Sequence, residues 1–82
     1  MVKTHEIELS TSVFNNFVQS DYIIIEDKAK EIEPNDYILF RQIETIEGET
    51  SNTGLYRLVQ VKEVVAHQGL KDGYVLLVVN KL

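Results

Sequence analysis

The chain has 82 residues, of which 44% are hydrophobic, and its formal net charge is −5. This length predicts one domain, residues 1–82, because a second hydrophobic core would not fit. The absence of cysteine excludes disulfides and thiolate metal sites, and the acidic balance argues against a general nucleic-acid coat protein, since phosphate binding needs local positive charge. No apolar run approaches the ~20 residues of a membrane span, and the first residues lack the apolar core of a signal peptide, so a cytoplasmic protein is expected.

The N-terminal segment predicts a strand followed by one main helix. In residues 4–9 acidic and apolar side chains alternate, which is typical of a half-buried strand, and the alternation puts His5 on its apolar face. Ser10 or Thr11 can serve as the N-cap of a helix over residues 12–19. The apolar residues of this helix share one compact face: Val13, Phe14, Phe17 and Val18.

Three further strands are expected in the middle of the chain. Residues 22–28 are rich in β-branched side chains and indicate a central strand. Residues 37–44 and 55–66 read as strands, and the polar segment 48–54, which has a glycine at each end, predicts a turn between them. The two strands are therefore expected to form a long hairpin, with residues 48–54 as its flexible tip.

The C-terminal part adds a loop and the last strand. Residues 68–73 contain two glycines and indicate a loop, and residues 74–79 form a strand that completes the sheet. A strand-rich order with one early helix predicts an α+β fold, a small mixed β-barrel of five to six strands. Closure of the barrel would remove the exposed edges of a chain this rich in isoleucine and valine.

Charged residues near strand ends are the first candidates for a binding site. Residues two apart in a strand share a face, so Glu26 and Lys28 are expected to project together, one accepting hydrogen bonds and the other holding an anion. The alternative is a surface ion pair of little energetic value. Arg41 and Arg57 lie on the two strands of the predicted hairpin and could bind phosphate together. The alternative is that they pair with Glu44, Glu47 or Glu63.

Metal and cofactor chemistry has little support in the sequence. The two histidines, His5 and His67, fall short of the three or four ligands that a metal site needs, and His5 is expected to form hydrogen bonds at a barrel end or groove. No serine lies in a nucleophile elbow and no glycine pattern matches a dinucleotide or phosphate loop, so neither a catalytic residue nor a cofactor is predicted. The four tyrosines could stack bases, but tyrosines in small barrels more often lie at the edge of the core.

Four sequence blocks follow one another in a recognisable order. Residues 5–8 read HEIE and correspond to the pattern H-x-L-K with the histidine kept, and residues 34–42 read PNDYILFRQ and correspond to V-G-D-x-L-x-L-R-E with Asp36 and Arg41 kept. Residues 69–75 read GLKDGYV and fit G-L-K-x-G-Y-V throughout, whereas residues 21–28 read DYIIIEDK and fit G-x-K-x-x-E-x-R in part. With these blocks the chain resembles, over nearly its whole length, the ASCH domain family of the PUA-like group, and more narrowly its short bacterial and phage members.

The resemblance implies a fold and a ligand class. It implies a PUA-like β-barrel with a helix beside a cleft, and RNA binding, which has been proposed for ASCH domains. Some members of the family are small amidohydrolases that act on modified nucleosides and use the motif lysine. In that motif this chain keeps the acid as Glu26 and a cation as Lys28, but it has Asp21 in place of the glycine and Ile23 in place of the lysine. The alternation of the strand would bury Ile23.

Two main classes of function therefore compete. The first is a non-catalytic RNA- or nucleotide-binding module, in which the cleft would be lined by His5, Glu26, Lys28, Arg41 and Arg57. Single-stranded or looped RNA suits such a cleft better than a duplex, because splayed bases can be read at their edges. The second is an enzyme on a modified nucleoside, with Glu26 as general base, an activity that Ile23 disfavours. A protein-interaction domain is a third hypothesis. The binding module is ranked first.

Overall fold

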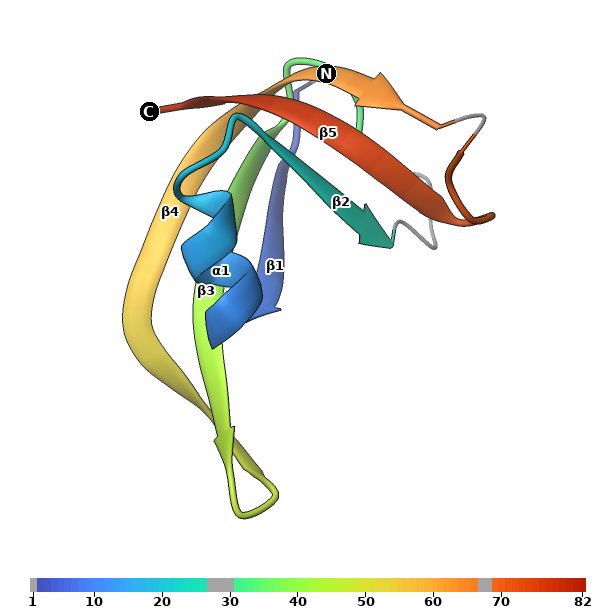
Figure 1. The fold of residues 1–82 in the computed structure, drawn as a ribbon. Helices are drawn as coiled ribbons and strands as arrows, with labels where there is room; N and C mark the ends of the chain where they lie inside the picture. The colour runs from blue at the N-terminus through green and yellow to red at the C-terminus, as the bar shows by residue number, and fades with distance from the viewer. Residues whose placement is uncertain (1, 27–30, 67–68) are drawn as a thin grey trace.

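A computed structural model describes residues 2–26, 31–66 and 69–82. These residues form five strands and one helix, as the sequence predicted (Figure 1). In chain order the elements are β1 (Thr4–Ser10), α1 (Thr11–Phe17), β2 (Tyr22–Glu26), β3 (Tyr37–Ile46), β4 (Glu49–Val65) and β5 (Tyr74–Lys81). The helix of the described residues is too short to cross a membrane bilayer.

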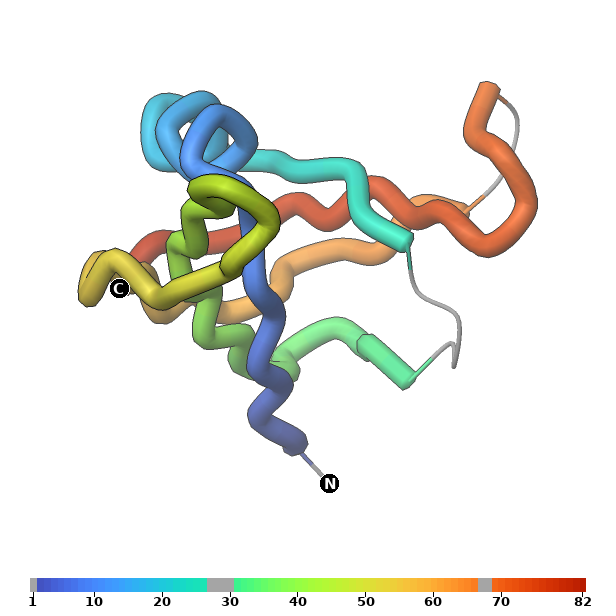
Figure 2. The backbone as a smooth tube through the Cα atoms, turned by 90° about the horizontal axis from the view of Figure 1, so that it is seen from below, coloured from blue at the N-terminus to red at the C-terminus, as the bar shows by residue number. Residues whose placement is uncertain are grey.

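The strands form one mixed sheet in the order β1-β3-β4-β5-β2. β1 and β3 are parallel, and the other neighbouring strands are antiparallel. Figures 1 and 2 show that the sheet is curved, with α1 beside it and the end strands β1 and β2 apart. No pairing between described residues joins these two strands, so the expected closure into a barrel is not seen.

The prediction of a central strand at residues 22–28 is wrong, because β2 lies at an edge of the sheet and pairs with β5 alone. The prediction rested on its β-branched side chains, which are enriched in strands in general. In the structure only alternate residues face the core, so Ile23 and Ile25 are buried while Ile24 is 49% exposed. The last two residues of the predicted strand lie outside the described residues.

The hydrophobic core fills the space between the inner face of the sheet and α1. Each strand contributes every second residue to it, as the pleat of a strand requires. The core residues are Leu9, Phe14, Phe17, Ile23, Ile25, Ile38, Phe40, Val59, Val61, Val75, Leu77 and Val79. Phe40 is fully buried, and its ring centroid lies 4.7 Å from that of Phe17 on the helix. This aromatic contact fixes α1 over β3.

The end of α1 is tied to the last strand. Lys81 Nζ of β5 donates a hydrogen bond to the carbonyl oxygen of Val18, at 2.6 Å, and lies 5.4 Å from the centroid of the Phe17 ring. Cations near a helix C-terminus stabilise the carbonyl groups that have no partner within the helix. Lys81 therefore has a structural role, and it holds α1 beside the sheet.

The tip of the β3–β4 hairpin differs from the predicted flexible loop at residues 48–54. The turn consists of Glu47 and Gly48 alone, whose φ angles of 53° and 82° are both positive, as in the type I′ turns that match the twist of a hairpin. The polar residues that follow Gly48 belong to β4 and pair with β3 as far as Ile46–Glu49. Their polarity reflects exposure on both faces of the projecting hairpin and not a loop.

A polar network replaces hydrophobic packing where the hairpin leaves the core. The register of β3 against β4 shifts between Arg41 and Ile43, and the intervening Gln42 is buried. Thr53 Oγ1 donates to Gln42 Oε1 at 2.7 Å, and Gln42 Nε2 donates to Asn15 Oδ1 on α1 at 3.1 Å. Both ends of the buried amide therefore have partners, as burial demands.

The Thr53–Gln42 bond predicts a difference between two threonines of β4. We expect Thr53→Val to lower the free energy of unfolding by about 1–3 kcal/mol, because it leaves the buried Gln42 oxygen without its donor. The matched control is Thr50→Val, which removes an exposed hydrogen bond to Thr45 and should change stability by no more than about 0.5 kcal/mol. Urea denaturation measures both, and equal losses would contradict a role for the network.

Candidate functional site

The carboxylate of Asp36 joins three segments of the chain. It follows the turn at Asn35, whose φ is 78°, and its side chain is buried. One oxygen accepts a hydrogen bond from the backbone N–H of Lys3 at 3.1 Å, and the other accepts from the N–H of Glu33 at 3.1 Å and from His5 Nε2 at 2.8 Å. The start of β1, the 33–36 turn and the start of β3 therefore meet at one anion.

These hydrogen bonds shift the pKa of Asp36. The bond from His5 is the largest cause, the backbone donors Lys3 and Glu33 add to it, and together they outweigh burial and lower the pKa from 3.8 to about 2. Because the ionised carboxylate can only accept, His5 Nε2 carries the proton in this contact. His5 was expected to form hydrogen bonds at a barrel end or groove, and its partner is the buried Asp36. No nucleophile among the described residues is hydrogen-bonded to the imidazole. The pair therefore has the features of a structural contact and not of a catalytic dyad.

The two candidate arginines do not meet. Arg41 is paired across the hairpin with Tyr56, and Arg57 with Phe40. Since neighbouring residues of a strand point to opposite faces, the two guanidinium groups leave opposite faces of the sheet. Arg41 Nε also donates to Glu6 Oε1 of β1 at 2.7 Å, in an ion pair on the outer face. An acid thus pairs with Arg41, but it is Glu6 and none of the three glutamates that the alternative interpretation named. The structure brings no joint phosphate site together from the two arginines.

The remaining pair of candidates is only half described. Glu26 is the last residue of β2, exposed and opposite Tyr74 of β5. Lys28 lies outside the described residues, so its expected place beside Glu26 stays a prediction. His5 and Arg41 belong to β1 and β3 at the other side of the sheet order, so Glu26 is not part of one cluster with them.

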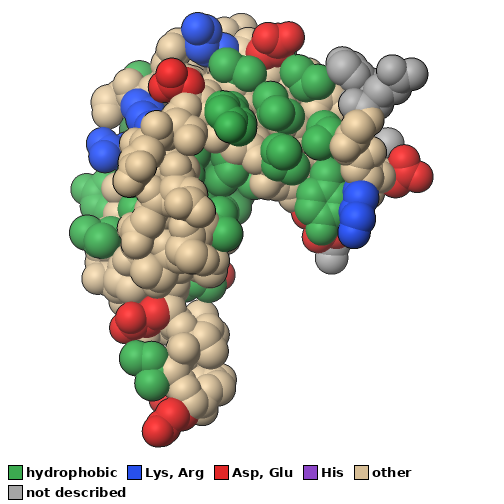
Figure 3. Space-filling view, viewed as in Figure 1, with side chains coloured by type: hydrophobic (Ala, Val, Ile, Leu, Met, Phe, Trp, Pro, Cys, Tyr) green, Lys and Arg blue, Asp and Glu red, His purple; other side chains and the backbone are tan. Residues whose placement is uncertain are grey.

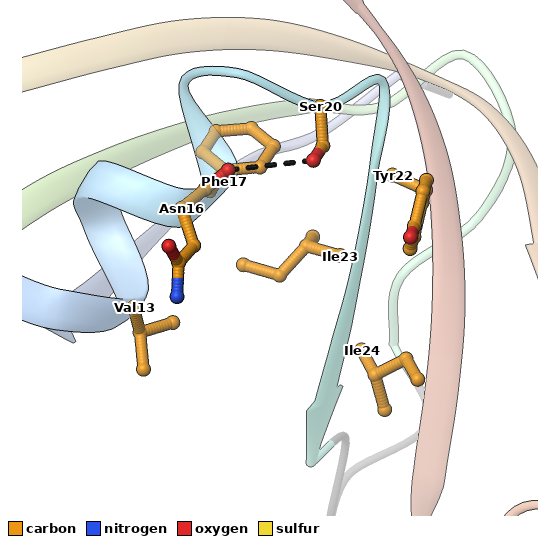
Figure 4. Close-up of a pocket in the computed structure, with 7 residues that line it drawn as sticks. All are labelled: Val13, Asn16, Phe17, Ser20, Tyr22, Ile23 and Ile24. Atoms are coloured by element: carbon orange, nitrogen blue, oxygen red, sulfur yellow. Dashed lines mark hydrogen bonds between the residues drawn. The ribbon is translucent and has the colours of Figure 1, made fainter.

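A groove lies between α1 and β2, on the side of β2 away from β5 (Figure 4). Its volume is about 270 Å³, and its lining residues are Val13, Asn16, Phe17, Ser20, Tyr22, Ile23 and Ile24. A tight turn forms it: the N–H of Ser20 donates to the carbonyl of Phe17 at 2.9 Å and its hydroxyl to the carbonyl of Asn16 at 3.3 Å. The turn sends β2 back past the helix and leaves a gap between the two elements.

The walls of the groove are mainly apolar. Figure 4 shows Ile23 pointing from β2 toward α1, where Val13 and the carboxamide of Asn16 stand opposite, while Tyr22 and Ile24 point away from the helix. Val13 is 42% exposed and Tyr22 is 56% exposed. The lining residues include no carboxylate, imidazole or amine, so the groove can hold an apolar group and offer the Asn16 amide as a hydrogen-bond partner, but it has no general acid or base for neutral pH.

The apolar surface extends from the groove over the outer face of β2 and β5. Figure 3 shows hydrophobic side chains gathered over these two strands, beside the hollow of the molecule. The register places Tyr22 opposite Val78 and Ile24 opposite Leu76. These four residues share the outer face, because Ile23 and Leu77 between them face the core.

Sequence reasoning missed the best-defined polar centres of the structure. Asp36, Gln42 and Lys81 were not candidates, although each makes specific hydrogen bonds over a long sequence separation. An aspartate directly after a Pro-Asn pair is a signal for a turn and could have indicated Asp36, whereas nothing in the sequence distinguishes Gln42. In the part of the chain that the structure describes, no group of three histidine or acidic side chains could hold a metal ion.

Comparison of the sequence with protein-family models found no match, and comparison with curated proteins found none either. The resemblance to ASCH domains therefore depends on the sequence blocks alone. Among the described residues the α1–β2 groove is a concave surface, and the charged candidates that the structure describes are dispersed.

Proposed function

We propose that the chain is a non-catalytic, cytoplasmic binding module of PUA-like type and that its ligand occupies the α1–β2 groove. The observation that carries the proposal is the position of the groove. Residues 21–28 fit the ASCH motif in part, and Tyr22, Ile23 and Ile24 of that segment line the groove next to α1. The resemblance implies a cleft beside the helix, and the groove lies there.

The residue at the motif lysine supports binding over catalysis. Ile23 stands at that position, is 6% exposed and forms the β2 wall of the groove. A hydrolase would need a proton donor or acceptor within hydrogen-bond reach of its substrate. Ile23 offers neither, and Ser20, the hydroxyl of the tight turn, donates to a backbone carbonyl.

The proposal predicts where small probes perturb the protein. In ¹H–¹⁵N spectra titrated with nucleoside monophosphates and with N-acetyl amides of leucine, phenylalanine and tryptophan, we expect at least one class to shift the amides of Val13, Asn16 and Ile24 selectively. Val13→Glu should abolish the shifts, because a carboxylate would be buried on binding without a partner.

The matched control is Ile46→Glu at the hairpin tip, which adds the same charge at a residue that is 62% exposed. We expect this variant to respond to the probes as the unmodified protein does. If every probe left the α1 and β2 amides unmoved, or moved those of the hairpin tip equally, the groove would not be a ligand site.

Single-stranded RNA or a nucleotide is one candidate ligand, favoured by the resemblance and by two side chains at the groove. The carboxamide of Asn16 can read the edge of a base, and the exposed Tyr22 can stack on one. The net charge of −5 and the neutralisation of Arg41 leave few cations for phosphate. With two to three phosphate contacts, oligouridylate should bind weakly, with a log–log salt slope of about −1.5 to −2; a salt-independent affinity would exclude this candidate.

A further inference from the structure

The two edge strands of the sheet are protected very differently. Natural sheets block their edges with charged side chains, proline or bulges, because an unpaired strand can pair with another chain. β1 carries the exposed acids Glu6 and Glu8. β2 has an exposed acid only at its last residue, Glu26, and before it the uncharged run Ile23 to Ile25, no proline, and an unbroken register with β5. Of the two edges, β2 is the one that offers its backbone to a partner.

The hydrogen-bonding direction of β2 follows from one bond. The N–H of Val79 donates to the carbonyl of Asp21 at 2.9 Å, so these two residues form a hydrogen-bonded pair. Such pairs alternate along antiparallel strands, and in the register of β2 with β5 Ile23 is the next residue bonded to β5. The N–H and C=O groups of Tyr22 and Ile24 therefore point away from β5, toward the groove.

We propose that an extended peptide segment of a partner protein binds here, by pairing its backbone with the outer edge of β2 and placing one apolar side chain in the groove. The inference rests on the proposed function, since it names the ligand of the same groove. Strand addition to a free edge obtains affinity from backbone hydrogen bonds and specificity from a pocket for alternate side chains. Val13, Phe17 and Ile23 provide that pocket, and Asn16 stands at its side to bond the added backbone.

Charge specifies the partner further. The protein has a net charge of −5, Asp21 immediately precedes β2, and no cation lines the groove. A bound segment with Lys or Arg flanking its apolar centre would meet complementary potential, which speeds association and selects partners. A second copy of this chain would bring the same negative charge to the interface and is disfavoured for that reason.

The test begins with selection of seven-residue peptides from a random display library on the immobilised protein. We expect enriched sequences with apolar residues in the centre and Lys or Arg at the ends. The affinity of a synthetic winner, measured by calorimetry, should fall about tenfold or more in Val13→Glu, because binding would bury an unpaired carboxylate. It should change less than about twofold in the equally charged Ile46→Glu, since affinity responds to contacts made in the complex.

N-methylation of the winning peptide tests the backbone pairing without altering the protein. Only alternate peptide amides point toward β2. Methyl groups on those amides should abolish binding, whereas methyl groups on the other set should leave it intact. Equal tolerance of both sets, or a peptide that binds as a helix, would overturn the proposal.

Two further outcomes separate this inference from the proposed function. If no peptide is enriched while small probes still shift the α1 and β2 amides, the peptide proposal fails and the groove remains a ligand site. If neither peptides nor probes bind, both fail. A concentration-dependent dimer that Ile24→Pro dissociates would also overturn the peptide proposal, because the edge would then serve a second copy; that change removes an outward N–H and no bond to β5.

Discussion

Replacement of Asp36 by alanine is expected to lower the free energy of unfolding by about 3–5 kcal/mol, because it removes a buried anion that three donors share. The donors are the backbone N–H groups of Lys3 and Glu33 and the Nε2–H of His5. A domain of this length has a total stability of roughly 4–12 kcal/mol. The variant should therefore lose between about a quarter and all of the stability of the domain, and circular dichroism in increasing urea would measure that loss.

The same carboxylate predicts a pH dependence with a definite sign. The pKa of Asp36 is about 2 in the folded protein and 3.8 for the free side chain. A lowered folded pKa means that its contribution, about 2 kcal/mol, is fully present above pH 3.8 and is lost as the pH falls toward 2. The difference in stability between the unmodified protein and Asp36→Asn should shrink over that acid range, as urea denaturation at pH 4 and at pH 2 would show.

An exposed aspartate provides the control for charge. Asp72 lies in the described part of the loop before β5 and is exposed, so Asp72→Ala should alter stability by no more than about 0.5 kcal/mol. If Asp36→Ala were as mild as Asp72→Ala, the hydrogen bonds to Asp36 would have no energetic weight. A stability difference between the unmodified protein and Asp36→Asn that grew on acidification would contradict the lowered pKa.

The elements of the fold could be read from the sequence because hydrophobic alternation is local. Polar and apolar residues alternate over 4–9, and residues 74–79 are a short continuous apolar run after a glycine; the strands β1 and β5 contain these segments. The helix was predicted from four apolar residues on one face, Val13, Phe14, Phe17 and Val18, of which Phe14 and Phe17 are buried in α1. For β1 and α1 the apolar residues of the buried face recur at a fixed spacing, and that spacing can be read from the sequence.

Sheet order could not be read in this way. The burial of Ile23 and Ile25 is the same for an edge strand and a central strand, because the pleat decides it and the number of neighbours does not. The polar run after Gly48 was read as a loop for a related reason: a hairpin exposed on both faces has no alternation to detect. Both errors concern how strands pair, which depends on residues far apart in the chain.

The candidate site shows the same limit. Expected cations such as Arg41 and Arg57 lie on paired strands, but their faces depend on a register that places Phe40 opposite Arg57. The groove, in contrast, has lining residues that are nearly continuous in sequence, within 13–24. A local segment therefore forms the groove, and three of its lining residues lie within 21–28, whereas the expected charged residues do not converge among the described residues.

Two adjacent isoleucines of β2 test the conclusion that residue 23 faces the core and residue 24 does not. Ile23→Ala is expected to destabilise the protein by about 2–5 kcal/mol, because it removes a buried side chain and leaves a cavity against α1. Ile24→Ala removes the same atoms from a residue that is 49% exposed and should cost less than about 1 kcal/mol, because most of that side chain is already in water. The matched pair differs only in which face of one strand is truncated, and urea denaturation of both variants measures the difference.

Ile23→Lys extends the test from stability to function. Its ammonium group would restore the motif lysine, but at a site that is 6% exposed and has no acidic side chain in the groove lining. Burying an unpaired charge is costly, so we expect this variant to be less stable than Ile23→Ala and to bind no groove ligand. If instead it folded with unchanged stability and hydrolysed an acylated nucleoside, the groove would be the scaffold of a disabled enzyme. Ile23 would then mark the loss of a catalytic lysine. Under the peptide-binding proposal, in contrast, Ile23 is a wall of the pocket that holds the apolar side chain of the peptide.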